Sequence, residues 1–230
     1  TTMQANQKYF PVRDSEGRLL PHFITFSNVQ SSCIDTVRQG NERVVRPRLS
    51  DAEFFWKQDR SHTLEDLSQR LAHVTFQNKL GSLLEKSRRV ARLAGSLSKA
   101  LGVDSDLAER AGLLGKADLL TNMVGEFPEL QGIMGRYYAQ HENLDNDIAF
   151  AIEDHYKPRF AGDELPRNTV GVAVALADKL ETLVGLFSIG EKPTGDKDPF
   201  ALRRQALGIL RMLMEGKLAI SFSELIETAL

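Results

Sequence analysis

The hydrophobic pattern of the chain changes once, and this change constrains the fold more than any other feature. Residues 6–29 alternate between apolar and polar side chains on either side of a turn-like segment, Asp14–Gly17, which is typical of a β-hairpin. From about Ile34 onward, apolar residues recur at helical spacing. The sequence therefore predicts a mainly α fold: a multi-helix domain preceded by a small β-hairpin or sheet element, with α+β character only at the amino terminus.

Three sections follow from this pattern. Residues 1–32 are predicted to form a β-hairpin element of a truncated amino-terminal region, residues 33–78 connecting helices, and residues 79–230 a helical domain. The chain starts at Thr1, in what reads as a strand, without an initiator methionine or signal peptide, so we expect an internal piece of a longer protein. An isolated hairpin is marginally stable in water, so further strands or packing helices should support it.

Composition limits the possible functions. A formal charge of −2 excludes a uniformly basic surface, so any contact with nucleic acid must use local clusters of arginine or lysine. The single cysteine, Cys33, cannot form an internal disulfide, which agrees with a cytoplasmic location. The longest clean apolar run, Val170–Ala177, is far shorter than the ~20 residues that span a bilayer, so no membrane segment is expected.

Local signals place several helices and loops. A helix is predicted from Leu83 to Leu101, ended by Gly102, and Asp104 or Ser105 should cap the next one. Further helices are predicted to begin near four positions: Pro128, Asp145, Asn168 and Asp198. Proline and glycine mark two loops, 157–166 and 190–196.

The first basic cluster lies in the segment Asn41–Trp56. Pro47 can open a helix at its first position, so Arg43, Arg46 and Arg48 are predicted to crowd a junction between two helical pieces. A stripe at three- and four-residue spacing is predicted to be buried beside them: Leu49, Ala52 and Trp56. Two interpretations of the arginines stay open, because they could bind a polyanion or could cap helices and pair with nearby carboxylates, namely Glu42, Asp51 and Glu53.

The second basic cluster lies in Asp196–Arg211, where an acidic cap and Pro199 predict the start of a helix. Arg204, Gly208 and Arg211 share one face of this helix, and a glycine there would permit close approach of another backbone or of a phosphate strand. The other face is apolar: Phe200, Leu207, Leu210 and Met214. Arginines beside acidic neighbours can equally hold helices together.

The order of helices after residue 80 resembles that of HD domains, metal-dependent phosphohydrolases named for adjacent His and Asp ligands. In that family a His, a His-Asp pair and a later Asp surround a divalent cation. The corresponding segments here are Lys86–Ala91, Ala111–Asp118 and Ala175–Leu180. Of the four ligand positions, only Asp178 matches the family.

The other three positions carry Lys86, Gly115 and Lys116, and neither glycine nor an ammonium group can donate a lone pair to a metal. Asp118 lies two residues further on and points elsewhere on a helix. We therefore predict no metal and no catalytic residue in this chain. Because an isolated buried carboxylate is costly, Asp178 should pair with Lys116 or Lys86; the alternative is a surface carboxylate paired with Lys179.

The histidines do not form a site in this interpretation. His141 and His155 are predicted to lie at the surface, since their spacing does not match a structural zinc pattern, and three others are similarly unconnected to chemistry: His22, His62 and His73.

Five segments resemble, in the same order, the β subunit of bacterial heterotetrameric glycyl-tRNA synthetase. They are Gln7–Pro11, Asn41–Phe55, Glu126–Gly135, Pro158–Pro166 and Asp196–Arg204. The resemblance covers almost the whole chain. It implies an α2β2 ligase that joins glycine to tRNA(Gly) with ATP and Mg, in which the α subunit holds the aminoacylation site. It also implies that the β subunit contributes tRNA binding and contains a degenerate HD-like domain, to which residues 79–230 would correspond.

The resemblance makes this chain a non-catalytic, tRNA-contacting and assembly section of the β subunit, inactive alone and without a cofactor of its own. Its partners would be the α subunit, tRNA(Gly) and the remainder of the β subunit. The candidate RNA-binding residues are Arg43, Arg46, Arg48, Arg203, Arg204 and Arg211. Two alternatives are a metal-dependent HD-type phosphohydrolase and a purely structural spacer between subunits.

Overall fold

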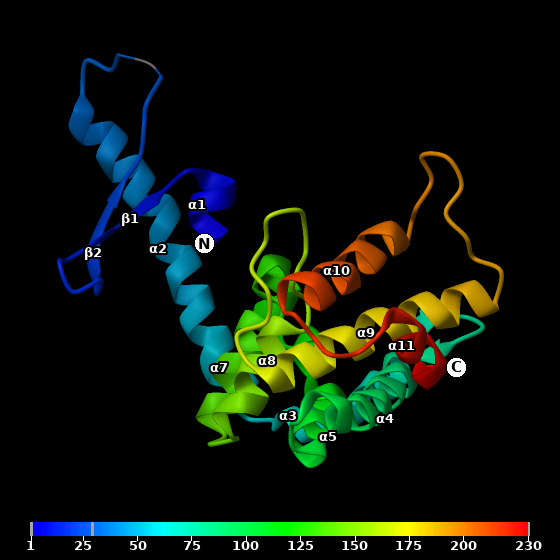
Figure 1. The fold of residues 1–230 in the computed structure, drawn as a ribbon. Coiled ribbons are helices and arrows are strands. Elements are labelled where there is room, and N and C mark those ends of the chain that lie inside the picture. Colours follow the sequence, from blue (N-terminus) through cyan, green and yellow to red (C-terminus); the bar gives the residue numbers. More distant parts are fainter. Residues whose placement is uncertain (1, 29, 230) are drawn as a thin grey trace.

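The computed structural model describes residues 2–28 and 30–229. Most of the chain forms a bundle of helices, and one long helix, α2 (Ile34–Asp59), extends from the bundle toward a small antiparallel sheet (Figure 1). The mainly α fold with an amino-terminal hairpin is therefore confirmed. None of the helices in the described ranges is long and apolar enough to cross a membrane.

The amino-terminal element consists of helix α1 (Thr2–Gln7) and strands β1 (Phe10–Arg13) and β2 (Leu19–Ile24), which pair antiparallel. Asp14 closes the predicted turn, because its carboxylate accepts hydrogen bonds from the backbone and side chain of Arg18. The strand expected at the start of the chain is wrong for residues 2–7, where helix-favouring residues such as methionine, glutamine and alanine form α1; Thr1 lies outside the described residues.

Helix α2 continues unbroken through Pro47, so the predicted junction between two helical pieces is wrong. Pro47 is exposed, and a proline inside a helix removes one backbone hydrogen bond without ending the ladder on either side. The predicted buried stripe begins later than expected, because Leu49 lies beyond the bundle and is 59% exposed. Ala52 and Trp56 do pack against the core.

The carboxyl end of α2 is anchored by the buried carboxylate of Asp59. Its Oδ1 accepts hydrogen bonds of 2.8 Å from the backbone and side-chain nitrogens of Asn122, and its Oδ2 accepts from Met123 N at 3.0 Å and Tyr138 Oη at 2.9 Å. The backbone donors belong to the first turn of α6 (Asn122–Glu126), where a negative charge is favourable. The Trp56 ring stacks on Tyr138 above this anchor.

The bundle follows in the order α3 (Leu64–Arg70), η1 (Leu71–His73), β3 (Thr75–Gln77), β4 (Gly81–Ser82), α4 (Leu83–Leu101), α5 (Ser105–Leu114), η2 (Ala117–Leu120), α6, η3 (Pro128–Leu130), α7 (Ile133–His141), α8 (Asn146–Asp154), α9 (Thr169–Ser188), α10 (Leu202–Glu215) and α11 (Phe222–Ala229). The β3–β4 pair interrupts the helical pattern that was expected to continue from Ile34. Helix α4 has the predicted bounds, and Gly102 ends it with φ of 68°.

The predicted cap Asp104 accepts a hydrogen bond from the first turn of α5. Helices α8 and α9 begin at the predicted positions, where Asp145 and Asn168 cap them in the same way. Two helix starts differ from the prediction. Only a short 3-10 turn begins at Pro128, and α10 begins at Leu202 rather than beside Pro199. The Asp198 carboxylate still accepts from the first backbone N–H groups of α10, so the cap is correct although the helix starts later.

Helix α9 is the centre of the bundle. It contacts α4, α5, α8, α10 and α11, and Figure 1 shows it running between α10 on one side and α4 with α5 on the other. Its apolar and small residues are buried on nearly every face, which is the pattern of a helix surrounded by other helices.

Helix α10 buries the glycine of its arginine face, where another backbone approaches closely as predicted, and it exposes Leu207, Leu210 and Met214 of its apolar face. Gly208 faces the core, and a side chain there would come within 3.0 Å of Lys179 Cε and 3.5 Å of Pro158 O, so the close approach is made by α9 and a loop. Of the apolar set, Phe200 packs against the core, whereas the exposed fractions are 61% for Leu207, 40% for Leu210 and 77% for Met214. The helix instead buries a different group of apolar residues, which includes Leu202, Ile209 and Met212.

Replacing Asp59 with Ala should lower the free energy of unfolding by about 3 kcal/mol, because four donors around a buried carboxylate would lose their acceptor. Urea unfolding measures this change. Asp51→Ala on the exposed part of α2 is the matched control and should change stability by less than about 0.5 kcal/mol. Equal effects of the two variants would show that Asp59 is not an anchor.

Candidate functional site

A buried cluster of charges occupies the position where the HD-like comparison places the cation. Asp178 of α9 lies with Oδ1 3.1 Å from Lys86 Nζ of α4 and Oδ2 3.2 Å from Lys116 Nζ, and only 7% of Asp178 is exposed. The sequence left open which lysine pairs with Asp178, and the structure places both there. The surface alternative is wrong, since Lys179 instead donates to the carbonyl oxygens of His155 and Lys157.

A second carboxylate that the sequence analysis missed completes the cluster. Lys86 Nζ also donates to Glu181 Oε2 at 2.5 Å and to Thr182 Oγ1 at 2.6 Å, and Arg89 Nε donates to Glu181 Oε1 at 2.8 Å. Helical spacing could have revealed this group, because Glu181 follows Asp178 by three residues just as Arg89 follows Lys86.

Mutual attraction favours the charged forms of Lys86 and Asp178. Burial lowers the pKa of Lys86, but Asp178 and Glu181 outweigh burial and hold that pKa above its usual value. Burial likewise raises the pKa of Asp178, yet Lys116 and Lys86 bring it well below the usual value for a carboxyl. For Lys116 the effect of burial is the larger one, and it lowers the pKa of this lysine. The cluster is therefore a set of basic groups arranged around the two carboxylates of Asp178 and Glu181.

Gly115 leaves space for a buried histidine beside the cluster. A side chain at Gly115 would come within 3.4 Å of His155 Cε1. The prediction of a surface position for His155 is wrong: the residue is 1% exposed, and its Nδ1 lies 2.8 Å from Ile152 O. Burial and the Lys116 charge lower the pKa of His155 to about 3, so the ring is neutral at pH 7.

The residues at this position do not fit a divalent cation. Two of the four comparable positions carry ammonium groups and one carries glycine, and none of these can coordinate a metal. No space large enough for a water molecule remains between Lys86, Lys116, His155 and Asp178. Across residues 2–28 and 30–229, no group of three or more His, Cys, Asp or Glu side chains is placed to hold a metal ion.

Asp118 points away from the cluster, as expected. Its Oδ2 accepts from Gly132 N at 2.6 Å and Gly135 N at 3.0 Å, and burial raises its pKa to about 6. A side chain at Gly135 would lie 3.1 Å from this oxygen, so the glycine permits the carboxylate to reach the backbone. These contacts give the segment 126–135 a structural role in starting α7.

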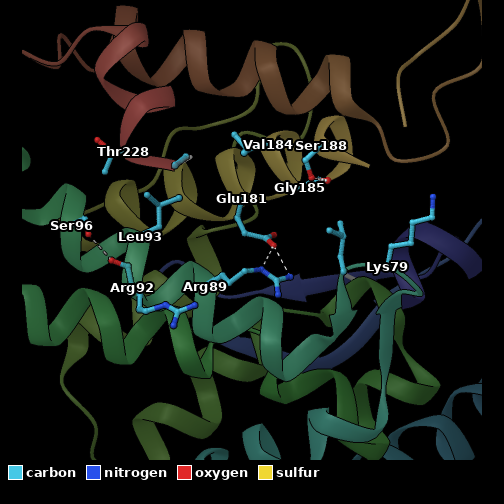
Figure 2. A pocket seen from close by; sticks show the side chains of 12 residues that line it. Lys79, Arg89, Arg92, Leu93, Ser96, Glu181, Val184, Gly185, Ser188 and Thr228 are labelled. Atoms are coloured by element: carbon cyan, nitrogen blue, oxygen red, sulfur yellow. Dashed lines mark hydrogen bonds and ion pairs between the residues drawn. The ribbon is translucent and has the colours of Figure 1, made fainter. Parts of the chain in front are cut away.

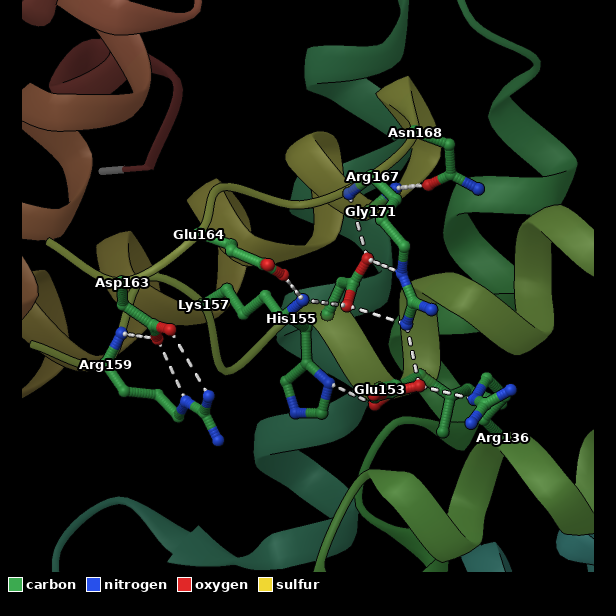
Figure 3. A network of polar contacts seen from close by, with 12 residues as sticks. Arg136, Glu153, His155, Lys157, Arg159, Asp163, Glu164, Arg167, Asn168 and Gly171 are labelled. Atoms are coloured by element: carbon green, nitrogen blue, oxygen red, sulfur yellow. Dashed lines mark hydrogen bonds and ion pairs between the residues drawn. The ribbon is translucent and has the colours of Figure 1, made fainter. Parts of the chain in front are cut away.

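A network of ion pairs fixes the loop 157–168 over the bundle (Figure 3). Asp154 accepts from Arg167 Nε at 2.8 Å and lies 3.2 Å from Lys157 Nζ, while Glu153 pairs with Arg136 and Arg167. Within the loop, Arg159 pairs with Asp163 at 2.9 Å. The charged residues of this segment therefore hold the loop in place, and they do not form a catalytic site.

Two of the six candidate RNA-binding arginines already have partners. Arg211 donates to the carbonyl oxygens of Phe160 and Asp163 and forms an ion pair with Glu215 at 2.7 Å. Arg48 lies 2.6 Å from Glu126 Oε1. These two guanidinium groups therefore join elements of the fold.

The other four candidates form two separate exposed pairs. Arg43 and Arg46 lie on the projecting part of α2, and Arg203 and Arg204 lie in the first turn of α10. Among the described residues, none of the four side chains makes an ion pair within 4 Å, so Arg43 and Arg46 do not form the pairs with Glu42, Asp51 and Glu53 that one of the two open interpretations implied. Glu42 instead forms an ion pair with Arg38 at 3.8 Å, and Glu53 forms one with Lys57 at 2.5 Å.

Comparison with known proteins gives consistent relatives. The family model described as glycyl-tRNA synthetase beta subunit matches residues 1–230. The chain is 63% identical over 228 residues to the glycine–tRNA ligase beta subunit of Janthinobacterium sp. (strain Marseille), covering 99% of this chain and 33% of the relative. The corresponding proteins of Thiobacillus denitrificans and Neisseria gonorrhoeae are 61% and 58% identical, each with 99% of this chain and 33% of the relative covered. The chain thus spans about a third of their length.

Replacing Asp178 with Ala should lower the free energy of unfolding by about 3–5 kcal/mol, because the two buried lysines would lose their shared carboxylate. Thermal or urea unfolding measures the effect, and Asp196→Ala is the control, because this exposed carboxylate forms no ion pair with any residue that the structure describes. A change within about 0.5 kcal/mol would contradict the buried pairing.

His155 should make the protein sensitive to acid. Its pKa in the folded state is about 3 and its usual value is 6.5, so the unfolded chain binds a proton that the folded chain excludes. The contribution is fully present above pH 6.5 and is lost as pH falls toward 3. Between pH 7 and pH 4.5, the wild type should lose about 2.5 kcal/mol more than His155→Gln.

The comparison of pH dependence is the readout, because His155→Gln also changes stability at neutral pH. His73→Gln removes an exposed histidine and should retain the full pH dependence of the wild type. Parallel stability curves for the wild type and His155→Gln would contradict the assignment.

Proposed function

Since the chain belongs to the family of glycyl-tRNA synthetase beta subunits, we propose that it is a non-catalytic, tRNA-contacting and assembly section of that subunit. The complete α2β2 enzyme would ligate glycine to tRNA(Gly) with ATP and Mg in the cytoplasm. The aminoacylation site would lie in the α subunit, so this chain needs no cofactor of its own.

The observation that carries the non-catalytic role is the pairing of Asp178 with Lys86 and Lys116. Fixed ammonium groups stand where a hydrolase of this architecture needs metal ligands, and they satisfy the remaining carboxylate. The arrangement supports a rigid helical platform whose function depends on its surface.

The two exposed arginine pairs are the best candidates for contact with RNA. Guanidinium groups without a protein partner can form two hydrogen bonds with a phosphate and do not first have to break an ion pair. Arg43 and Arg46 lie on the helix that projects from the bundle, while Arg203 and Arg204 lie on the bundle itself (Figure 1). We assign Arg48 and Arg211 to folding, because Arg48 pairs with Glu126 and all three nitrogens of the Arg211 guanidinium group are engaged.

The two alternatives make different predictions. An HD-type phosphohydrolase requires stoichiometric metal and turnover of a phosphate ester, and the donor set at Asp178 argues against it. A spacer between subunits requires assembly but no contact with RNA. Measuring tRNA affinity in the assembled complex therefore separates the spacer from the proposed role.

Charge reversal of Arg203 and Arg204 to Glu in the complete α2β2 enzyme should weaken tRNA(Gly) binding by about 10- to 100-fold. The slope of log affinity against log salt should also fall by about 2, because two phosphate contacts would be lost. Filter binding or fluorescence anisotropy at two or more salt concentrations measures both quantities.

The matched control is Arg110→Glu, which reverses an exposed arginine of α5 outside both pairs. It should leave affinity within about threefold and the salt slope unchanged, since general electrostatic attraction changes little with one distant charge. Unchanged affinity in the double variant, with intact α2β2 assembly, would favour the spacer.

A further inference from the structure

A pocket of about 480 Å³ lies between α4, α9 and α11 and opens to solvent beside Lys79. Figure 2 shows Arg92 and Ser96 on one side of it, Lys79 on the other, and the ion pair between Arg89 and Glu181 in the middle. Pockets of this size hold small organic ligands. The functions considered so far use none of these rim residues.

Two cations on the rim of the pocket have no partner. Within the described part of the chain, the side chains of Lys79 and Arg92 make no hydrogen bond or ion pair, although both line the pocket. Arg92 is one turn beyond Arg89 on α4, so both guanidinium groups are on the pocket side of that helix. An anionic ligand would supply the acceptors that the protein does not.

The acidic group in the pocket does not oppose an anion. Both oxygens of Glu181 are occupied, Oε2 by Lys86 Nζ at 2.5 Å and Oε1 by Arg89 Nε at 2.8 Å. Lys86 is shared with Asp178, which Lys116 also neutralises. Three cations therefore surround two carboxylates beneath the pocket, and the rim adds two further positive charges.

Hydroxyl and apolar groups complete the lining. The hydroxyls of Ser96, Ser188 and Thr228 donate to carbonyl oxygens of their own helices at 3.0, 2.7 and 2.7 Å, so their oxygens remain available to accept from a ligand. Leu80, Leu93 and Val184 supply an apolar wall. The pocket thus combines cations for a phosphate, acceptors for sugar hydroxyls and a surface for an apolar ring.

We propose that this pocket binds a phosphate-bearing ligand of nucleotide size, with its phosphate beside Arg92 and with Lys79 closing the opposite rim. The ligand is a free nucleotide or a terminal nucleotide of RNA, which share the same chemistry. This proposal does not depend on the RNA contacts assigned to α2 and α10.

Calorimetric titration of AMP into the isolated full-length β subunit tests the proposal, because the α subunit and its aminoacylation site are then absent. We expect AMP to bind at least about tenfold more tightly than adenosine, since the phosphate meets the guanidinium of Arg92, which is unpartnered among the described residues. Arg92→Gln should weaken AMP binding about tenfold and Lys79→Gln about threefold. Arg88→Gln is the control, because this exposed arginine of α4 does not line the pocket.

Measuring tRNA binding by the same variants shows whether the ligand is a free nucleotide or the terminal nucleotide of an RNA. A selective loss of tRNA affinity in Arg92→Gln, with competition by AMP, identifies an RNA terminus; an unchanged tRNA affinity identifies a free nucleotide. Absence of AMP binding at millimolar concentration overturns the proposal. Equal weakening by Arg92→Gln and Arg88→Gln also overturns it, since that result indicates general electrostatic attraction.

Discussion

The ionised carboxylate of Asp178, held between Lys86 and Lys116, is the interaction on which the bundle depends. It joins α9 to α4 and to the segment between α5 and η2, three parts of the chain that are distant in sequence. A buried ion pair of this kind contributes little net stability relative to apolar packing, but removing one partner leaves an uncompensated charge. The requirement to match every charge therefore specifies one arrangement of these helices.

The same cluster explains how an architecture that resembles a metal-dependent hydrolase can serve another purpose. The ammonium groups provide positive charge at a fixed distance from the carboxylate, and the absence of a side chain at Gly115 leaves room for the neutral ring of His155. The negative charge of Asp178 is thus balanced by lysine side chains of the protein itself.

Features governed by local chemistry could be predicted from the sequence. The helix end at Gly102, the cap at Asp104, the helix start near Asn168 and the need of Asp178 for a cation each follow from a few neighbouring residues. Features that depend on packing could not. Helix α10 carries apolar residues on two faces, and spacing alone does not say which face meets α9.

Pro47 and His155 show that the local tendency of a residue can differ from its place in the fold. Proline weakens a helix locally, yet the hydrogen bonds on both sides of Pro47 are sufficient to continue α2. Histidine is usually near the surface, yet His155 is enclosed because Gly115 from a distant segment leaves space beside it. For the RNA-binding candidates, the engagement of Arg48 and Arg211 likewise arises from tertiary contacts.

The uninterrupted course of α2 has a mechanical consequence. A helix of 26 residues is about 39 Å long, and its carboxyl end is attached to the bundle at Asp59. Tilting this rod by about 10° about that attachment would displace its far end by about 7 Å. A small rotation at the base is therefore amplified into a large displacement of the hairpin, so the helix could act as a lever between the bundle and whatever the hairpin contacts.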